Sequence, residues 1–143
     1  MTALFSKRCE LGLQAMLYLS TLEKDQVANA KEISEKLKIP KEFVSKVLQA
    51  LAIKKIVGSK KGRFGGFFLL MASSEIRLLD IVIAIDGLEI FQKCALGFLN
   101  CEDGKPCPVH SSWGKLRDEV LEMLRVNTLE SITDSTLKKI RNL

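Results

Sequence analysis

Three cysteines and the only histidine of the chain lie within the segment "CALGFLNCEDGKPCPVH", residues 94–110. Cys94, Cys101, Cys107 and His110 follow the spacing C-x6-C-x5-C-x2-H. Thiolate sulfur and imidazole nitrogen are ligands for zinc and for iron–sulfur clusters. Only Cys107 and His110 form the close pair that is common in zinc sites. The wide gaps, which contain glycine and proline, favour a loop that wraps around a larger group such as a cluster.

Other uses of these residues stay open. Without a metal, the thiols would be passive or would form a reversible disulfide under peroxide. A cysteine beside His110 is also a pairing used in nucleophilic catalysis. No third orienting group or phosphate-binding loop stands out, so we expect no enzyme. Cys9 lies in an apolar helical pattern beside Glu10, and we interpret it as a structural cysteine.

The composition is that of an ordinary folded chain. It has 143 residues, of which 47% are hydrophobic, 27% charged and 6% aromatic, enough for one domain with a sizeable core. No apolar run reaches about 18 residues, and charges interrupt the N-terminus where a signal peptide would be apolar. We therefore expect a cytoplasmic protein without a membrane partner. A reducing cytoplasm favours metal or redox roles for clustered cysteines.

Positive charge is concentrated in the first half of the chain. Residues 1–70 contain 13 Lys/Arg and 6 Asp/Glu, whereas residues 71–143 contain 9 and 11. The formal net charge is +5 and the pI about 9.1. Such a basic half is typical of proteins that bind a polyanion, most simply nucleic acid.

Apolar periodicity predicts a helix-turn-helix in this basic half. A buried helix is predicted over residues 10–22, and Asn29 and Glu32 form an N-cap pattern that opens a short helix over 30–37. The tripeptide "KIP" turns the chain into a helix over 41–54. Two short helices around a tight turn are typical of DNA-binding motifs. The expected buried stripe of the second helix consists of Phe43, Val44, Val47, Leu48 and Leu51.

The segment "IVGSKKGRFGGFFLL", residues 56–70, reads as strand, turn and strand. A β-hairpin directly after a helix-turn-helix predicts a wing. Lys60, Lys61 and Arg63 at its tip would enter a minor groove or bind phosphates. On the preceding helix, the residues that would read bases or bind phosphates are Lys41, Ser45, Lys46 and Gln49.

The fold class that follows is mainly α, a winged helix-turn-helix with a small hairpin plus a long dimerisation helix. We divide the chain into a DNA-binding domain (1–90), a cysteine-rich sensor loop (91–109) and a dimerisation helix with its tail (110–143). An apolar helix over 78–88 connects the first two parts, and a last short helix is predicted over 135–141. The predicted dimer face consists of Trp113, Leu116, Val120, Leu121 and Leu124.

These pieces together resemble the IscR-type winged-helix iron–sulfur transcription regulators, a family that includes nitric-oxide-sensing repressors. The resemblance covers roughly residues 4–132. It rests on "LFSKRCELGLQAMLYLS", on "ISEKLKIPKEFVSKVLQAL", on the Gly-rich "KKGRFGGFFLL", and on the three cysteines followed by "PVHSSW" and "NTLESI". It implies a homodimer that binds a palindromic operator in double-stranded DNA. It also places Glu42, Ser45 and Lys46 at base-reading positions.

The resemblance further implies a cluster held by the three cysteines, with one of two fourth ligands. Where a histidine three residues past the last cysteine completes the set, as His110 would, the cluster is [2Fe–2S]. Where a carboxylate from the first helix of the partner completes it, as Glu10 would, the cluster is [4Fe–4S]. We favour His110 because the C-x2-H pair is intact. Zinc or no metal stays an alternative, since some relatives bind no cluster.

The sequence also departs from the family pattern. The first cysteine gap has six residues instead of five, and Lys61 stands where the iron–sulfur regulator has arginine. Lysine lacks the planar fork of arginine, so operator preference would differ. We expect that oxidation, nitrosylation or loss of a cluster rearranges the loop over 94–108. This would change the spacing of two recognition helices, and thereby DNA affinity.

Overall fold

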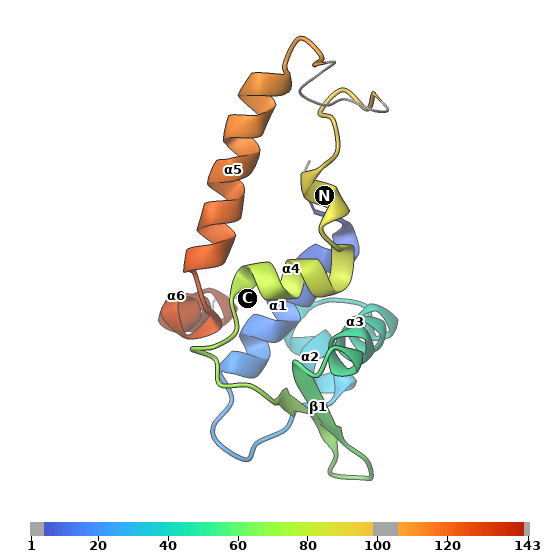
Figure 1. Cartoon of the computed structure of the whole chain (residues 1–143). Coiled ribbons are helices and arrows are strands. Elements are labelled where there is room, and N and C mark those ends of the chain that lie inside the picture. Colours follow the sequence, from blue (N-terminus) through green and yellow to red (C-terminus); the bar gives the residue numbers. More distant parts are fainter. Residues whose placement is uncertain (1–4, 99–105, 142–143) are drawn as a thin grey trace.

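Helix α1 (Lys7–Ser20) runs through the middle of the molecule, and helices from both halves of the chain pack around it (Figure 1). The computed structural model describes residues 5–98 and 106–141. Helix α1 begins before the predicted start because the Ser6 hydroxyl caps it, accepting a hydrogen bond from the Cys9 N–H at 3.0 Å.

The helix-turn-helix is formed by α2 (Ala30–Leu37) and α3 (Lys41–Ile53). The predicted cap is confirmed, because the Asn29 side-chain oxygen accepts from the Glu32 N–H at 2.8 Å. Lys38 ends α2 in the left-handed conformation with φ 58°, and this sharp bend sets the direction of α3.

The predicted hairpin is confirmed as β1 (Val57–Lys60) paired antiparallel with β2 (Gly66–Leu69). A backbone bridge fixes it to the loop before α2. The Ala28 N–H donates to the Phe67 carbonyl at 3.0 Å, and the Phe67 N–H donates to the Ala28 carbonyl at 2.7 Å. The hairpin is therefore held against the helix-turn-helix rather than extending freely from it.

The second half of the chain contains α4 (Leu78–Asp86), the short 3-10 helix η1 (Glu89–Phe91), α5 (His110–Val126) and α6 (Leu129–Arg141). Helix α4 ends slightly before the predicted end because Gly87 follows it with φ 79°. With the hairpin, these helices confirm the mainly α winged-helix class.

The prediction of a short last helix over 135–141 is wrong, because α6 already begins at Leu129. Its cap explains the difference. The Ser131 N–H donates to the Thr128 hydroxyl at 3.1 Å, and the Thr128 N–H donates to the Ser131 hydroxyl at 3.0 Å. This reciprocal pair starts the helix earlier than the apolar pattern indicated.

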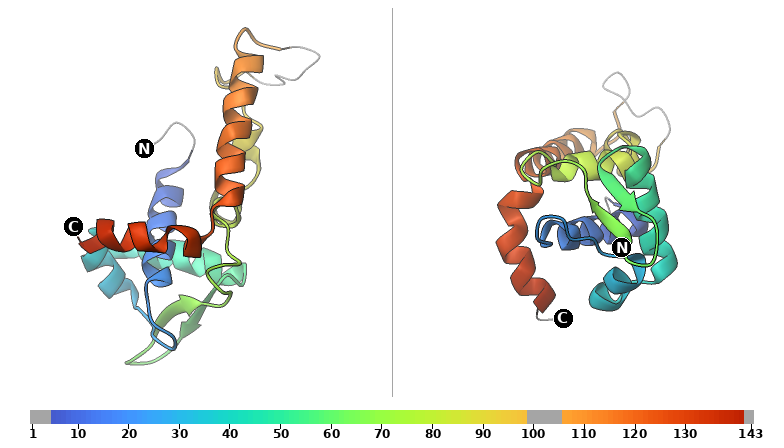
Figure 2. Two further views of the ribbon diagram at one scale, coloured as in Figure 1. Left: turned by 90° about the vertical axis from the view of Figure 1, so that its left-hand side faces the viewer. Right: turned by 90° about the horizontal axis from the view of Figure 1, so that it is seen from below.

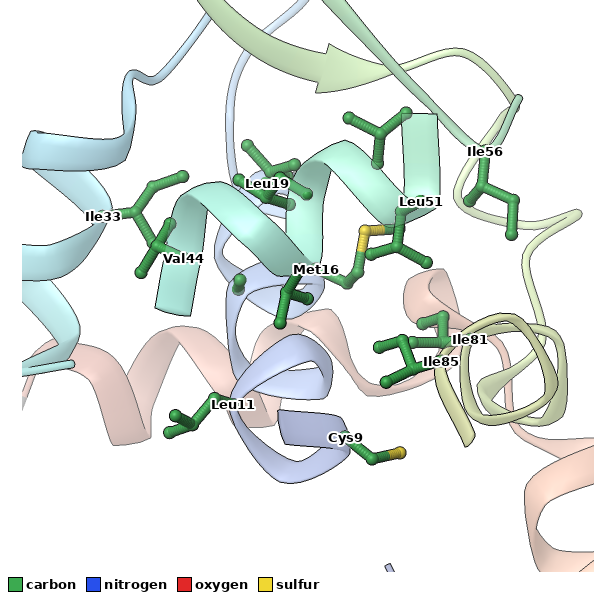
Figure 3. Close-up of a cluster of buried hydrophobic side chains, with 14 of the residues drawn as sticks. Cys9, Leu11, Met16, Leu19, Ile33, Val44, Leu51, Ile56, Ile81 and Ile85 are labelled. Atoms are coloured by element: carbon green, nitrogen blue, oxygen red, sulfur yellow. The ribbon is translucent and has the colours of Figure 1, made fainter. Parts of the chain in front are cut away.

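The core is one continuous cluster of buried apolar side chains (Figure 3). Met16 of α1, Ile33 of α2 and Leu51 of α3 are fully buried in it. Leu124 of α5 and Leu129 of α6 belong to the same cluster. The described residues thus share one core across the boundary predicted at residue 110.

Helix α5 and the segment that follows α4 project away from this core (Figures 1 and 2). The wing lies at the opposite end of the molecule. The N-terminal end of α5, where His110 lies, is the end of this helix farther from the wing.

Gly12 lies at a very close contact between helices around α1, and it gives a prediction. A Cβ at this position would overlap Ile85 Cδ1 and would lie 2.8 Å from Val47 Cγ1. We expect Gly12→Ala to lower the free energy of unfolding by about 1–3 kcal/mol, because the side chains of Ile85 and Val47 must shift to accommodate the methyl group. Urea denaturation followed by circular dichroism measures the change.

Gly114→Ala is the matched control, since Gly114 lies inside α5 and the nearest atom to its added Cβ is 3.9 Å away. The same substitution there should raise the free energy of unfolding by about 0.5–1 kcal/mol. Equal effects of the two variants would contradict the packing described around α1.

Candidate metal centre and DNA-binding surface

Helix α3 presents its predicted DNA-binding residues to solvent. Its inner face is formed by four residues that point into the core, Val44, Val47, Leu48 and Leu51. Its outer face carries Lys41, Glu42, Lys46 and Gln49, which are exposed, and Ser45, which is half-buried. An amphipathic helix with one polar, outward face can enter a major groove.

Phe43 does not belong to the buried stripe in which it was predicted, because its side chain is 43% exposed. The stripe begins at Val44 and repeats at helical spacing, and the position before Val44 falls outside it. The outer face of α3 thus begins with an apolar aromatic ring. An apolar side chain at such a position can contact the methyl group of thymine.

The wing carries its three predicted cations in the open. Lys60, Lys61 and Arg63 are exposed. A tight turn closes the hairpin, with the Gly65 N–H donating to the Gly62 carbonyl at 3.0 Å. Since α3 leads directly into β1 and contacts it, the cationic tip and α3 belong to one structural unit.

At the other end of the molecule, Cys94 and Cys107 lie side by side with 3.6 Å between their Sγ atoms. Both are half-buried. They line a small pocket together with His110, the first residue of α5, whose N–H donates to the Cys107 carbonyl at 3.1 Å. Cys101 lies outside the described residues.

Cys94 and Cys107 are spaced as two thiolate ligands of one metal atom would be. Two thiolates bound to one tetrahedral metal atom at about 2.3 Å lie roughly 3.8 Å apart, close to the 3.6 Å between Cys94 and Cys107. Within residues 5–98 and 106–141, no group of three or more His, Cys, Asp or Glu side chains is arranged to hold a metal ion. Cys94, Cys107 and His110 line one pocket but are not placed as a three-ligand site. A complete site therefore needs a movement of His110, or a further ligand from residues outside these ranges or from a second subunit.

Glu10, the alternative fourth ligand, lies on α1 and does not line the cysteine pocket. Its carboxylate is 3.7 Å from the Lys7 ammonium, and its side chain is 17% exposed. Within one chain, the pocket brings together Cys94, Cys107 and His110 without it.

Trp113 connects the cysteine segment to α5. Its indole N–H donates to the Lys93 carbonyl at 2.9 Å, and the residue lines the same pocket as Cys94 and Cys107. Apolar spacing predicted Trp113 only as part of a dimer face. A partly buried indole N–H usually finds a hydrogen-bond acceptor, so a polar contact of Trp113 was to be expected. The sequence does not show that the acceptor is the Lys93 carbonyl.

The other predicted dimer residues differ in exposure. Leu124 is buried within the chain, whereas Leu116 is 56% exposed. Val120 and Leu121 are half-buried and pack against the core. Met123, which the dimer prediction did not include, is 49% exposed. The apolar surface that the middle of α5 leaves open is therefore centred on Leu116 and Met123.

The C-terminal end of α5 is tied to the segment between the wing and α4. The Leu78 N–H donates to the Asn127 carbonyl at 3.0 Å, and the Leu129 N–H donates to the Ile76 carbonyl at 3.0 Å. These bonds flank a bridge between Arg77 and Thr128. Helix α5 is thus attached near the cysteines at one end and to the segment after the wing at the other.

An ion pair stabilises the start of α4 at this bridge. The Arg77 guanidinium lies 2.8 Å from the Asp80 carboxylate, and the Arg77 backbone N–H donates to the same carboxylate at 2.9 Å. Burial alone would raise the pKa of Asp80, but the hydrogen bonds from Arg77 outweigh it and hold that pKa below its ordinary value. The pair therefore persists at neutral pH.

Cys9 is separate from the cysteine pocket and fully buried in the core. Burial, together with the nearby Asp86 carboxylate, raises the pKa of its thiol to about 12. A thiol with this pKa is protonated at neutral pH and is a poor ligand and nucleophile. The structure agrees with the interpretation of Cys9 as a structural cysteine.

This contrast predicts selective alkylation in metal-free protein. Iodoacetamide at pH 8 should modify Cys94 and Cys107, because both thiols are partly accessible, and it should leave Cys9 unmodified. Peptide mass spectrometry measures the modification at each site. Unfolding in urea is the control, since it should make Cys9 react as well. Modification of Cys9 in the folded protein at the rate of Cys107 would contradict its burial.

The wider architecture is shared with known regulators. The structure of CymR, the global cysteine regulator of B. subtilis, superposes with a TM-score of 0.76 at 21% sequence identity, over 92% of this chain and 96% of that one. The structure of IscR from T. potens gives a TM-score of 0.71 at 22% identity, over 91% and 85% of the two chains. At these identities the likeness concerns the fold. None of the described helices is long and apolar enough to cross a membrane.

Sequence comparison gives the family. The "Putative HTH-type transcriptional regulator" of Aquifex aeolicus is 29% identical over 131 residues, which cover 90% of each chain. IscR of Photorhabdus laumondii is 26% identical over 124 residues, which cover 87% of this chain and 75% of that one. These relatives are transcription regulators and not enzymes, as predicted. The family model described as Rrf2, iron-dependent transcriptional regulator, matches residues 5–135, and the chain therefore belongs to the Rrf2 family of winged-helix transcription regulators.

Proposed function

We propose that the protein is a homodimeric, sequence-specific DNA-binding regulator whose operator affinity is set by an iron–sulfur cluster. The observation that carries this proposal is the position of Cys94, Cys107 and His110 at one end of α5. The other end of the same helix is hydrogen-bonded to the segment that follows the wing. A chemical change at the cysteines would therefore act on the elements that bind DNA.

The proposed DNA-binding surface consists of the outer face of α3 and the tip of the wing. On α3, exposed Lys46 and Gln49 and half-buried Ser45 suit base or phosphate contacts in a major groove. Lys60 and Lys61 at the wing suit phosphates beside a minor groove. Two copies of this surface, related by a two-fold axis, would bind a palindromic operator.

A dimer is supported by the exposed apolar surface of α5. Leu116 and Met123 lie seven residues apart on one side of the helix and are 56% and 49% exposed. Half-buried Val120 lies between them. Because α5 projects from the core, pairing with α5 of a second subunit would bury this row.

The residues proposed to hold the cluster are Cys94, Cys101, Cys107 and His110, as in a [2Fe–2S] site. Thiolates and imidazole together suit such a cluster, and a spacing of 3.6 Å between Cys94 Sγ and Cys107 Sγ suits two ligands of one iron. A [4Fe–4S] cluster completed by Glu10 of a second subunit is the alternative. When bound, the cluster supplies a group that oxidants, nitric oxide or iron shortage alter or remove.

The protein's own residues would transmit the change. His110 begins α5, and Trp113 holds the segment before Cys94 through the carbonyl of Lys93. A shift of the cysteine segment would therefore move the N-terminal turns of α5. At its other end, the bonds from Asn127 and Leu129 to the segment after the wing would convey the movement. The spacing of two recognition helices, which must match the DNA, would change with it.

A thiol switch without a cluster is the second candidate, and the same distance favours it. The Sγ atoms of Cys94 and Cys107 lie 3.6 Å apart, and a disulfide would bring them to about 2.05 Å. A peroxide would oxidise the two thiols to the disulfide and would itself be reduced to water or an alcohol. This candidate predicts a colourless protein.

Metal analysis after anaerobic purification tests the cluster. We expect brown protein that contains iron and acid-labile sulfide in equal amounts, and an absorption band in the visible range. Cys107→Ala should lose iron and colour, because it removes a thiolate ligand. Cys9→Ala is the matched control and should keep both, since Cys9 is fully buried away from the pocket.

Colourless protein with stoichiometric zinc, or without metal after anaerobic reconstitution, would contradict the cluster. In the first case the loop is a structural site. In the second, a reversible disulfide between Cys94 and Cys107 after peroxide treatment would support the thiol switch.

A further inference from the structure

Phe64 is the most exposed large apolar side chain among the described residues, at 86%. It lies at the tip of the wing, where Arg63 and Phe64 are the two central residues of the turn closed by Gly62 and Gly65. The sequence pattern predicted a role only for the cations of this tip. A phenylalanine at the end of a hairpin contributes nothing to the core, and its ring is fully available to a binding partner.

The surroundings of Phe64 are cationic. Residues 60–66 read "KKGRFGG" and contain three positive charges and no acidic residue. The Arg63 guanidinium carbon lies 5.6 Å from the centroid of the Phe64 ring, within the range of a cation–π contact. The tip therefore presents an aromatic ring together with a guanidinium as one unit.

The hairpin holds this unit in a fixed position. A Cβ on Gly65 would overlap the Lys60 carbonyl oxygen, and one on Gly66 would lie 2.7 Å from the Ala28 carbonyl oxygen. The turn is thus packed against its own backbone, and the base of the wing against the loop before α2. Phe64 is presented on a tightly packed support and does not fold back onto the chain.

Building on the DNA-binding function proposed above, we propose that Phe64 is a wedge that inserts between two base pairs in the minor groove beside the major groove occupied by α3. Double-stranded DNA has anionic phosphates outside and stacked bases inside. The cations of the tip suit the phosphates, and the Phe64 ring suits the stacked bases. Apolar wedges that unstack a base step are a known mode of minor-groove binding. The negative electrostatic potential of the same groove would attract the Arg63 guanidinium.

The wedge gives the wing a way to select sequence without hydrogen bonds to bases. Pyrimidine–purine steps unstack more readily than other steps. The operator should therefore contain such a step beneath each wing. The sequence of this base step would affect affinity, although no hydrogen bond joins the wing to its bases.

The test begins with selection of duplexes from a random-sequence DNA library by the wild-type protein. Affinity for a selected duplex is then measured by fluorescence anisotropy at several salt concentrations for F64A, F64L and K61A. We expect F64A to bind about tenfold more weakly, from the lost burial of the ring, with an unchanged salt slope. K61A should reduce that slope by about one.

F64L should retain most of the affinity, because leucine also serves as a wedge. A duplex with 2-aminopurine at the selected pyrimidine–purine step should gain fluorescence with wild type and not with F64A. The variants should fold normally, since the position is 86% exposed, and thermal melting followed by circular dichroism verifies this.

Equal affinities of F64A and wild type for every selected duplex, with no gain in 2-aminopurine fluorescence, would overturn the wedge and leave DNA binding intact. If the wild-type protein selects no duplex at all, the proposed DNA-binding function fails and the wedge fails with it. Loss of affinity in F64A with a reduced salt slope would also overturn the wedge, because it would indicate lost phosphate contacts instead.

Discussion

The burial of α1 between helices from both halves of the chain is the constraint on which the structure depends. Cys9, Met16 and Leu19 of this helix are buried in the core (Figure 3). Helices α3, α4 and α6 all contact α1, and Gly12 lets α4 approach it closely. Helix α3 cannot move far relative to α1 without disturbing this core. A regulatory change would therefore act where the molecule projects from the core, which is along α5.

Helix α5 is held at both ends by a small number of hydrogen bonds. Near the cysteines, the Trp113 indole binds the Lys93 carbonyl. At the opposite end, the bonds of Asn127 and Leu129 join α5 and α6 to the segment after the wing. The length between the two ends carries exposed Leu116 and Met123, as expected of a helix that meets a second subunit. The proposed sensor, dimer surface and DNA-binding unit are thus connected through one helix.

Most of the fold was predictable from the sequence because the apolar periodicity in the first half is strong. The cap at Asn29, the turn before α3 and the hairpin followed from local rules that the structure satisfies. The prediction was wrong for Phe43, where an aromatic side chain next to the buried stripe was included in it. It was also wrong for the start of α6. Asn127 and Glu130 form a cap pattern in the sequence, but the helix was predicted only from residue 135, and the cap in the structure is the neighbouring pair Thr128 and Ser131.

The candidate site was predictable in residue type and not in geometry. Spacing along the chain identified Cys94, Cys107 and His110 as partners, and one pocket contains all three. The distance between the two sulfur atoms and the acceptor of the Trp113 indole depend on long-range packing, which no local pattern specifies.

The most direct test of the proposed control is the affinity of the cluster-loaded and the cluster-free protein for one selected operator, measured at one fixed salt concentration. We predict that the two dissociation constants differ by about tenfold or more, and that the difference disappears in Cys107→Ala. Equal dissociation constants for the loaded and the free protein would contradict the claim that the cysteine pocket controls the DNA-binding unit through α5.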